Sequence, residues 1–157
     1  MPQEDIEDVK RRICEWMKGR GIFIREIKSE ETLFKFEGRT ETQVGIVVAQ
    51  PKKLFRSIVI ISKLEIHPNH QEALGRLNSK EKADFVWDLK KDLIFVPATF
   101  EMEPSTDNLK SIQFAKEISF DELTDGRLIE AVDNVCRPLI WTAWVFVKMF
   151  GKPEEVH

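Results

Sequence analysis

The sequence has no tyrosine and only two cysteines, Cys14 and Cys136, among its 157 residues. Without tyrosine, no phenol is available for acid–base chemistry or for a hydrogen bond from a buried ring. Both cysteines fall within helical patterns and lack the Cys-x-x-Cys spacing of redox and zinc sites. We interpret them as small buried hydrophobic residues, with a disulfide between them left open, and a reducing compartment fits best.

The chain also lacks a strong charge of either sign, since 24 basic residues stand against 27 acidic ones. This balance provides no general attraction to nucleic acid or to anionic lipid, so we expect neither as a partner. The acidic start does not resemble a secretory signal, which favours a cytoplasmic protein. Repeats and Gly/Ser-rich linkers are absent as well, and we expect one domain over residues 1–157.

Motifs that bind phosphate or activate a nucleophile are missing, including the P-loop, Gly-x-Gly-x-x-Gly and Gly-x-Ser-x-Gly. His67 and His70 lie three residues apart, but no cysteine accompanies them as a further metal ligand. We interpret this pair as a solvated helix start. We therefore predict no catalytic residue, cofactor site or metal site, and we favour a non-enzymatic protein without excluding an enzyme.

Hydrophobic periodicity predicts an α+β fold. Apolar residues three and four apart indicate a first helix over 4–18, which glycines end. Short apolar runs separated by turns, including one at 37–40, indicate an antiparallel meander. The four predicted strands cover residues 22–28, 32–37, 42–49 and 56–66.

After Pro68 the helical period returns, and Asn78 with Glu81 has the spacing of a capping box for a helix over 80–94. Strands at 95–103 and 110–118 and a last helix over 121–150 complete the pattern. We therefore predict an antiparallel sheet of about five to six strands, packed by N-terminal, central and long C-terminal helices.

The last helix contains the segment PLIWTAWVFVKMF, in which Thr142 and Lys148 are the only polar residues. The segment is shorter than the ~20 apolar residues that span a membrane. It is also more apolar than one amphipathic face requires. Pro138 is predicted to kink the helix and separate this half from the preceding one. The segment either lies in a groove of its own domain or also covers a second subunit. We predict a homodimer with Trp141, Trp144 and Phe150 near the seam.

Four segments carry a resemblance to known proteins: Ile13-Cys14-Glu15-Trp16, the run from Ser57 to Ser62, the helix containing Phe85-Val86-Trp87-Asp88-Leu89, and the final helix. The whole chain resembles an uncharacterised family of archaeal domains of unknown function. The element order resembles the fold of type III secretion chaperones. That resemblance implies a dimeric protein-binding scaffold, although the strand after residue 50 and the longer last helix depart from the chaperone pattern.

The favoured hypothesis is a non-enzymatic homodimeric scaffold, or chaperone-like module, that binds a peptide or partner protein. The alternative is a small-molecule binder or an enzyme with a pocket between sheet and helices, for which Arg25, Glu65 and His67 are the candidate polar groups. A weaker third hypothesis has the apolar segment docking on a membrane surface.

Overall fold

The computed structural model describes residues 3–104 and 107–153. It has the predicted order of helices and strands, with a short 3₁₀ turn before the last helix. The elements are α1 (Gln3–Gly19), β1 (Phe23–Glu26), β2 (Thr32–Arg39), β3 (Gly45–Pro51), β4 (Ser57–Glu65), α2 (Pro68–Arg76), α3 (Ser79–Leu93), β5 (Thr99–Glu103), β6 (Ser111–Ser119), η1 (Phe120–Glu122) and α4 (Asp125–Phe150).

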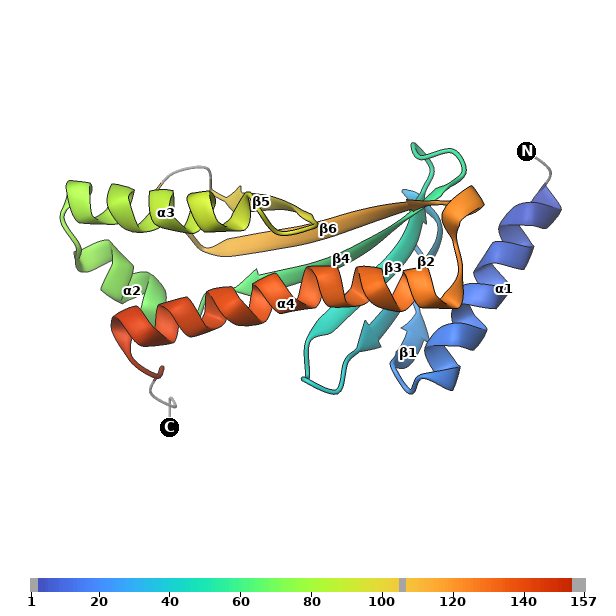
Figure 1. Ribbon diagram of the computed structural model, residues 1–157, viewed down its shortest axis with the longest axis horizontal. Helices are drawn as coiled ribbons and strands as arrows, with labels where there is room; N and C mark the ends of the chain where they lie inside the picture. The colour runs from blue at the N-terminus through green and yellow to red at the C-terminus, as the bar shows by residue number, and fades with distance from the viewer. Residues whose placement is uncertain (1–2, 105–106, 154–157) are drawn as a thin grey trace.

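The strands form one six-stranded antiparallel sheet in the order β1-β2-β3-β4-β6-β5. Consecutive hairpins produce the meander, and β6 then pairs along the full length of β4. Figure 1 shows α4 lying lengthwise in front of the sheet, with α1 at one end and α2 and α3 at the other. The predicted α+β architecture is confirmed.

Alternation along the strands directs one set of side chains toward the helices. Phe36, Val48 and Ile60 follow one another across β2, β3 and β4, and all three are buried. Ser62 continues this face, and its hydroxyl donates a 2.7 Å hydrogen bond to the carbonyl of Val135 in α4. This hydrogen bond fixes the position of α4 along strand β4.

The predicted turn at residues 37–40 is wrong, because β2 continues through Arg39 and the turn begins at Thr40. Gly38 lies within the strand where α1 and β1 approach the sheet. A Cβ there would lie 2.6 Å from the carbonyl oxygen of Ile22 and 2.9 Å from Cε of Met17. The glycine therefore allows a close backbone approach, a role that sequence reasoning assigns less readily than a turn.

Other local predictions are confirmed. Gly21 adopts a positive φ of 71° just after α1, as expected of a helix stop. The Asn78 side chain caps α3 by accepting a hydrogen bond from the amide of Glu81, and the Glu81 carboxylate accepts one from the amide of Asn78. The strand predicted at 95–103 is shorter, because residues 94–98 form the connection from α3 to β5.

Helix α4 runs without interruption through Pro138, so the proline does not divide it into two elements. The Thr142 hydroxyl donates a 2.7 Å hydrogen bond to the Pro138 carbonyl one turn earlier. This contact lets a buried threonine sit in an apolar helix without an unpaired hydroxyl.

Candidate functional site

The C-terminal half of α4, residues 138–150, is more apolar than the N-terminal half, yet it does not bury more of its residues. Phe146 is almost inaccessible, yet Trp144 is 67% exposed and Met149 also faces solvent. Trp141 is half-buried. The fold therefore covers only part of the apolar segment that the sequence analysis singled out.

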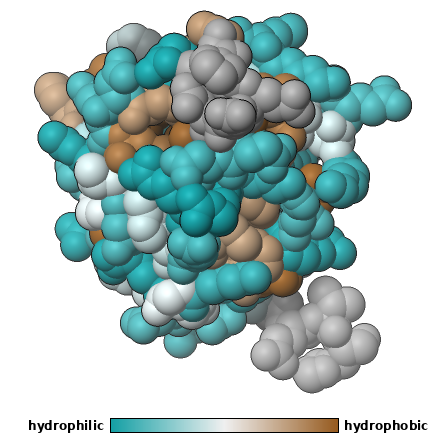
Figure 2. Space-filling model, turned by 90° about the vertical axis from the view of Figure 1, so that its right-hand side faces the viewer, coloured by the Kyte–Doolittle hydropathy of each residue, from teal (hydrophilic) through white to brown (hydrophobic). Residues whose placement is uncertain are grey.

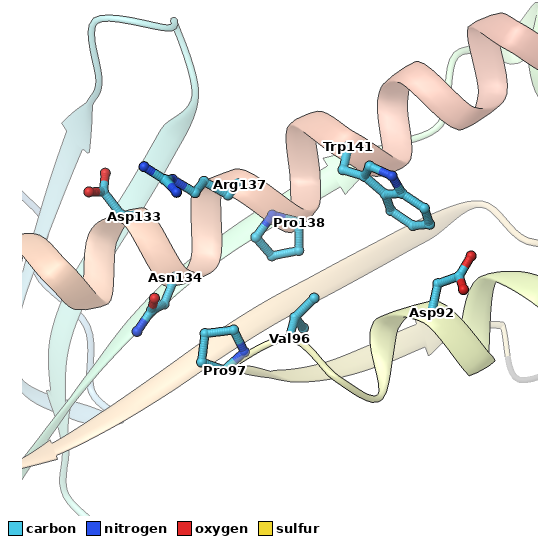
Figure 3. A pocket seen from close by; sticks show the side chains of 8 residues that line it. All are labelled: Asp92, Val96, Pro97, Asp133, Asn134, Arg137, Pro138 and Trp141. Atoms are coloured by element: carbon cyan, nitrogen blue, oxygen red, sulfur yellow. The ribbon is translucent and has the colours of Figure 1, made fainter.

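A groove runs between the middle of α4 and the end of α3 (Figure 3). It has a volume of about 390 Å³, and apolar groups from both sides face each other across it. Pro138 and Trp141 project from α4 toward Val96 and Pro97, while the Asp92 carboxylate lies near the Trp141 end. Phe95, next to this wall in sequence, is 88% exposed. Grooves of this kind suit an apolar segment of a protein partner.

Phe150, the third predicted interface residue, is half-buried in a cluster with Phe85, Phe146 and His70. Its ring centroid lies 5.4 Å from that of Phe85 and 6.0 Å from that of Phe146. Phe150 thus helps to fasten α4 to α2 and α3 within the chain. Trp144, by contrast, is largely exposed.

The interpretation of the histidines as a solvated helix start is wrong for His70. This ring is buried, stacks on Phe146 at 5.8 Å and has Nε2 2.8 Å from the Gly151 carbonyl oxygen. His67 caps α2, since its Nδ1 accepts a hydrogen bond from the amide of Asn69. Both rings are used to build the α2–α4 junction. His157 lies outside the described residues.

The polar groups of the small-molecule alternative do not converge on one site. Glu65 and His67 border a small cavity of about 150 Å³ beside Phe146 and Val147. Arg25 instead lies on the edge strand β1, where it pairs with Glu37 at 2.6 Å. Across residues 3–104 and 107–153, no cluster of three or more His, Cys, Asp or Glu could hold a metal ion.

Cys14 and Cys136 are both free thiols. Burial, assisted by the negative charge of Asp133, raises the pKa of the Cys136 thiol to about 11. A thiol with this pKa is a poor nucleophile near neutral pH. Glu101 and Glu103 share an exposed face of β5.

The outward side of α4 carries a line of residues spaced four, four, three and four apart: Asp133, Arg137, Trp141, Trp144 and Lys148. We name this set the outer stripe. Its members lie on one helix face, since Trp141 and Trp144 differ by only about 60° around the axis. Asp133, Arg137 and Lys148 are exposed, and none forms an ion pair within the described part of the chain.

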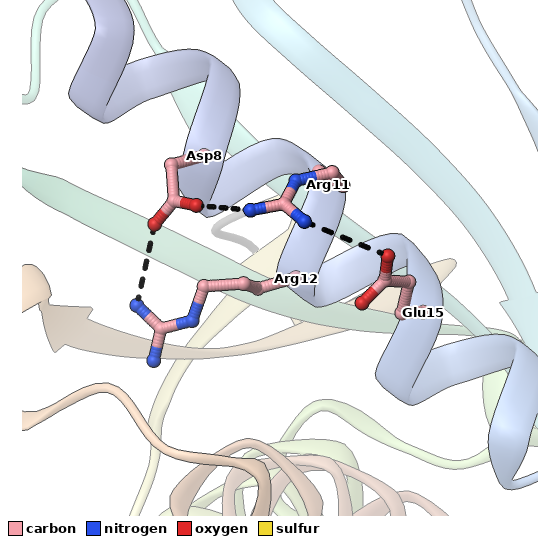
Figure 4. A network of polar contacts seen from close by, with 4 residues as sticks. All are labelled: Asp8, Arg11, Arg12 and Glu15. Carbon is pink, nitrogen blue, oxygen red and sulfur yellow. Dashed lines mark hydrogen bonds and ion pairs between the residues drawn. The ribbon is translucent and has the colours of Figure 1, made fainter.

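The basic cluster Lys10-Arg11-Arg12 on α1 differs, because its cations have acidic partners (Figure 4). Arg11 contacts Asp8 and Glu15, and Arg12 lies 3.8 Å from Asp8. Lys10 pairs with Glu26 of β1 at 2.6 Å. Figure 2 shows the α1 end as mostly hydrophilic, with apolar groups visible in gaps between polar side chains.

The model of a family described as "Uncharacterized conserved protein (DUF2299)" matches residues 9–146. The chain belongs to this family. No curated protein matches it.

Solved structures extend the comparison. An uncharacterised protein from Methanothermobacter thermautotrophicus is 25% identical, with a TM-score of 0.86, and the match covers 90% of this chain and 99% of that one. A chain of the HopA1-SchA chaperone–effector complex is 7% identical, with a TM-score of 0.57 and 92% and 98% coverage. A chain of the ExsC-ExsE complex is 14% identical, with a TM-score of 0.54 and 89% and 94% coverage. These matches confirm the predicted secretion chaperone-like fold.

Sequence reasoning missed one wall of the groove. Val96 and Pro97 fell inside a predicted strand, whereas they form the bend that faces α4. The proline itself was the available signal, because proline is disfavoured in strand interiors. The exposure of Phe95 and of Trp87 on α3 was not foreseen either.

Proposed function

We propose that the chain acts as a non-enzymatic homodimeric module that binds a peptide or partner protein. The observation that carries the proposal is the exposure of large apolar side chains, above all Trp144 and Phe95, on the two segments whose neighbouring residues Trp141 and Val96 line one groove. Monomeric proteins rarely leave adjoining large apolar groups uncovered without an interaction to cover them. The chaperone–effector complex with the same fold is a precedent for partner binding.

In this proposal the exposed side of α4, with Trp141 and Trp144, forms the dimer seam, and Phe150 supports it from beneath. Buried tryptophans dominate the free energy of many interfaces. Light scattering at micromolar concentration tests the assembly, with a dimer expected for the wild type and a shift toward monomer for Trp144→Ala. A wild-type protein that scatters as a monomer contradicts the proposal.

The groove borders the proposed seam at Trp141, and its inner part, between Pro138 of α4 and the Val96-Pro97 wall, is the proposed site for the partner segment. Asn134→Arg places a long charged side chain in the groove from the half-buried surface of α4. We expect it to abolish capture of partners that the immobilised wild type retains from the native cell. Glu72→Arg on exposed α2 is the matched control and should retain them. Strong thermal stabilisation by a small metabolite would instead favour the small-molecule alternative.

No helix in the described ranges combines the length and apolar character that crossing a membrane requires.

A further inference from the structure

The outer stripe of α4 is complementary to itself when two copies of the helix run in opposite directions. Asp133 and Lys148 lie equally far from the point between Ile140 and Trp141, and so do Arg137 and Trp144. A two-fold axis through this point therefore places Asp133 opposite Lys148 and Arg137 opposite Trp144 of the second copy. Two-fold interfaces repeat each such contact twice.

We infer that a second copy of this chain docks on the outer stripe through an antiparallel α4–α4 contact with Trp141 at the axis. The inference rests on the proposed homodimer and specifies its geometry. Each contact has a physical reason: an ion pair joins Asp133 to Lys148, and the Arg137 guanidinium stacks on the face of Trp144. The tryptophans supply the apolar centre, and the charges form its rim.

The charges of the stripe favour this occupant over an unrelated partner. On α1, by contrast, Lys10, Arg11 and Arg12 are paired with acidic neighbours within the chain. In the outer stripe, Asp133, Arg137 and Lys148 are left without ion pairs among the described residues. One anion and two cations around two indole rings provide every group that the antiparallel contact uses.

The geometry also limits how the helices cross. Asp133 and Lys148 each lie about 11 Å along the helix from the axis, at 1.5 Å per residue. A crossing near 20° keeps facing residues at this distance within side-chain reach, whereas a crossing near 50° separates them. The inference therefore includes a shallow crossing. Figure 1 shows α4 in front of the sheet along its length, and Asp133, Trp144 and Lys148 are exposed on it.

Charge reversal followed by mixing tests the contact. Asp133→Lys and Lys148→Asp each place like charges opposite each other, and each should raise the dimer dissociation constant about tenfold or more in sedimentation equilibrium. An equimolar mixture of the two variants should recover an affinity within about threefold of wild type. Only a direct contact between these positions in different chains predicts recovery on mixing.

Glu72→Lys makes the same charge change as Asp133→Lys, but on α2, and should leave the dissociation constant unchanged. Both stripe residues are exposed, so circular dichroism should show an unchanged fold for every variant. If either charge reversal leaves the dissociation constant of the dimer unchanged, or if mixing the two variants does not restore it, the antiparallel contact is wrong, but the proposed dimer is not contradicted. A monomeric wild type overturns both.

Discussion

The helices α1 and α4 pack on the same sheet but differ in the residues on their outer sides. In α1, Val9, Ile13 and Met17 enter the core, and ion pairs within the chain occupy much of the outer side. In α4, one side is buried against the rest of the chain, and the outer side carries two tryptophans and charged residues without ion pairs among the described residues. The outer side of α4 therefore carries apolar surface that the fold itself does not cover, whereas ion pairs within the chain occupy much of the outer side of α1.

The largest expected loss of stability concerns Phe146, the deeply buried aromatic residue in the C-terminal half of α4. Phe146→Ala removes a ring that is 1% exposed and contacts His70, Phe85 and Phe150. We expect the free energy of unfolding to fall by about 3–5 kcal/mol in urea denaturation. Phe95→Ala, the same change at a site that is 88% exposed, should cost about 0.5 kcal/mol or less. Equal losses of unfolding free energy in the two variants would contradict the view that Phe146 holds α4 in place while Phe95 contributes nothing to the fold.

The two cysteines compare the helices directly, since Cys14 lies on α1 and Cys136 on α4. With a pKa of about 11, Cys136 holds only about a thousandth of its thiol as thiolate at pH 8. We expect Ellman's reagent to modify one thiol per native chain, with Cys136 reacting at least about a hundredfold more slowly than Cys14. In Cys14→Ser the native chain should be nearly inert, and denaturant should expose one thiol. Rapid labelling of that variant would show that α4 is loosely packed.

Gly38 tests how closely α1 is seated. Gly38→Ala introduces a Cβ against the Ile22 carbonyl and the Met17 side chain, and we expect about 1–3 kcal/mol of destabilisation. Gly45→Ala adds the same atom where nothing lies within 4 Å, and should be neutral within about 1 kcal/mol. Thermal unfolding of both variants measures the difference. Similar melting temperatures would mean that α1 can shift away from Gly38 at little cost in stability.

The smallest effect belongs to the ion pair between Lys10 and Glu26. The hydrogen bond from Lys10 lowers the pKa of Glu26 from its usual 4.5, and the same bond raises the pKa of Lys10 from 10.5. The stabilisation by Glu26 is therefore present above pH 4.5 and is lost as pH falls through the lowered pKa. The contribution of Lys10 is lost as pH rises through its raised pKa.

We expect Glu26→Gln to cost less than about 1 kcal/mol at pH 7, and the cost should vanish as pH falls below the lowered pKa of Glu26, where the carboxyl is neutral in both states. Urea titrations from pH 7 into the acid range provide the measurement. Glu30→Gln removes the same charge at an exposed site without an ion pair among the described residues, and should leave the stability at pH 7 unchanged. A loss at pH 7 that persists in acid would assign the effect to packing.

The sequence predicted features that depend on local spacing. The Asn78–Glu81 capping box and the period of α4 follow from neighbours a few residues apart. Features set by distant segments were missed, because no local pattern reports them. Gly38 was taken for a turn since its packing against Met17 is a tertiary contact. His70 was taken for a solvated residue since its partner, Gly151, lies 81 residues away.

The candidate site was predicted in part for the same reason. Trp141 and Trp144 were recognised because they lie three residues apart in a segment that is more apolar than one amphipathic face requires. The opposing wall at Val96 and Pro97 depends on how α3 is placed against α4, which composition does not encode. Whether Trp141, Trp144 and Phe150 meet a second chain stays a prediction.

The pairing of Ser62 with Val135, 73 residues later, has a consequence for how the protein is made. Synthesis proceeds from the N-terminus, so β4 emerges long before the helix that covers it. Until α4 is released, the apolar face with Phe36, Val48 and Ile60 lacks its main cover. The nascent chain therefore passes through a late interval in which its sheet is exposed to aggregation, and completing α4 ends that interval.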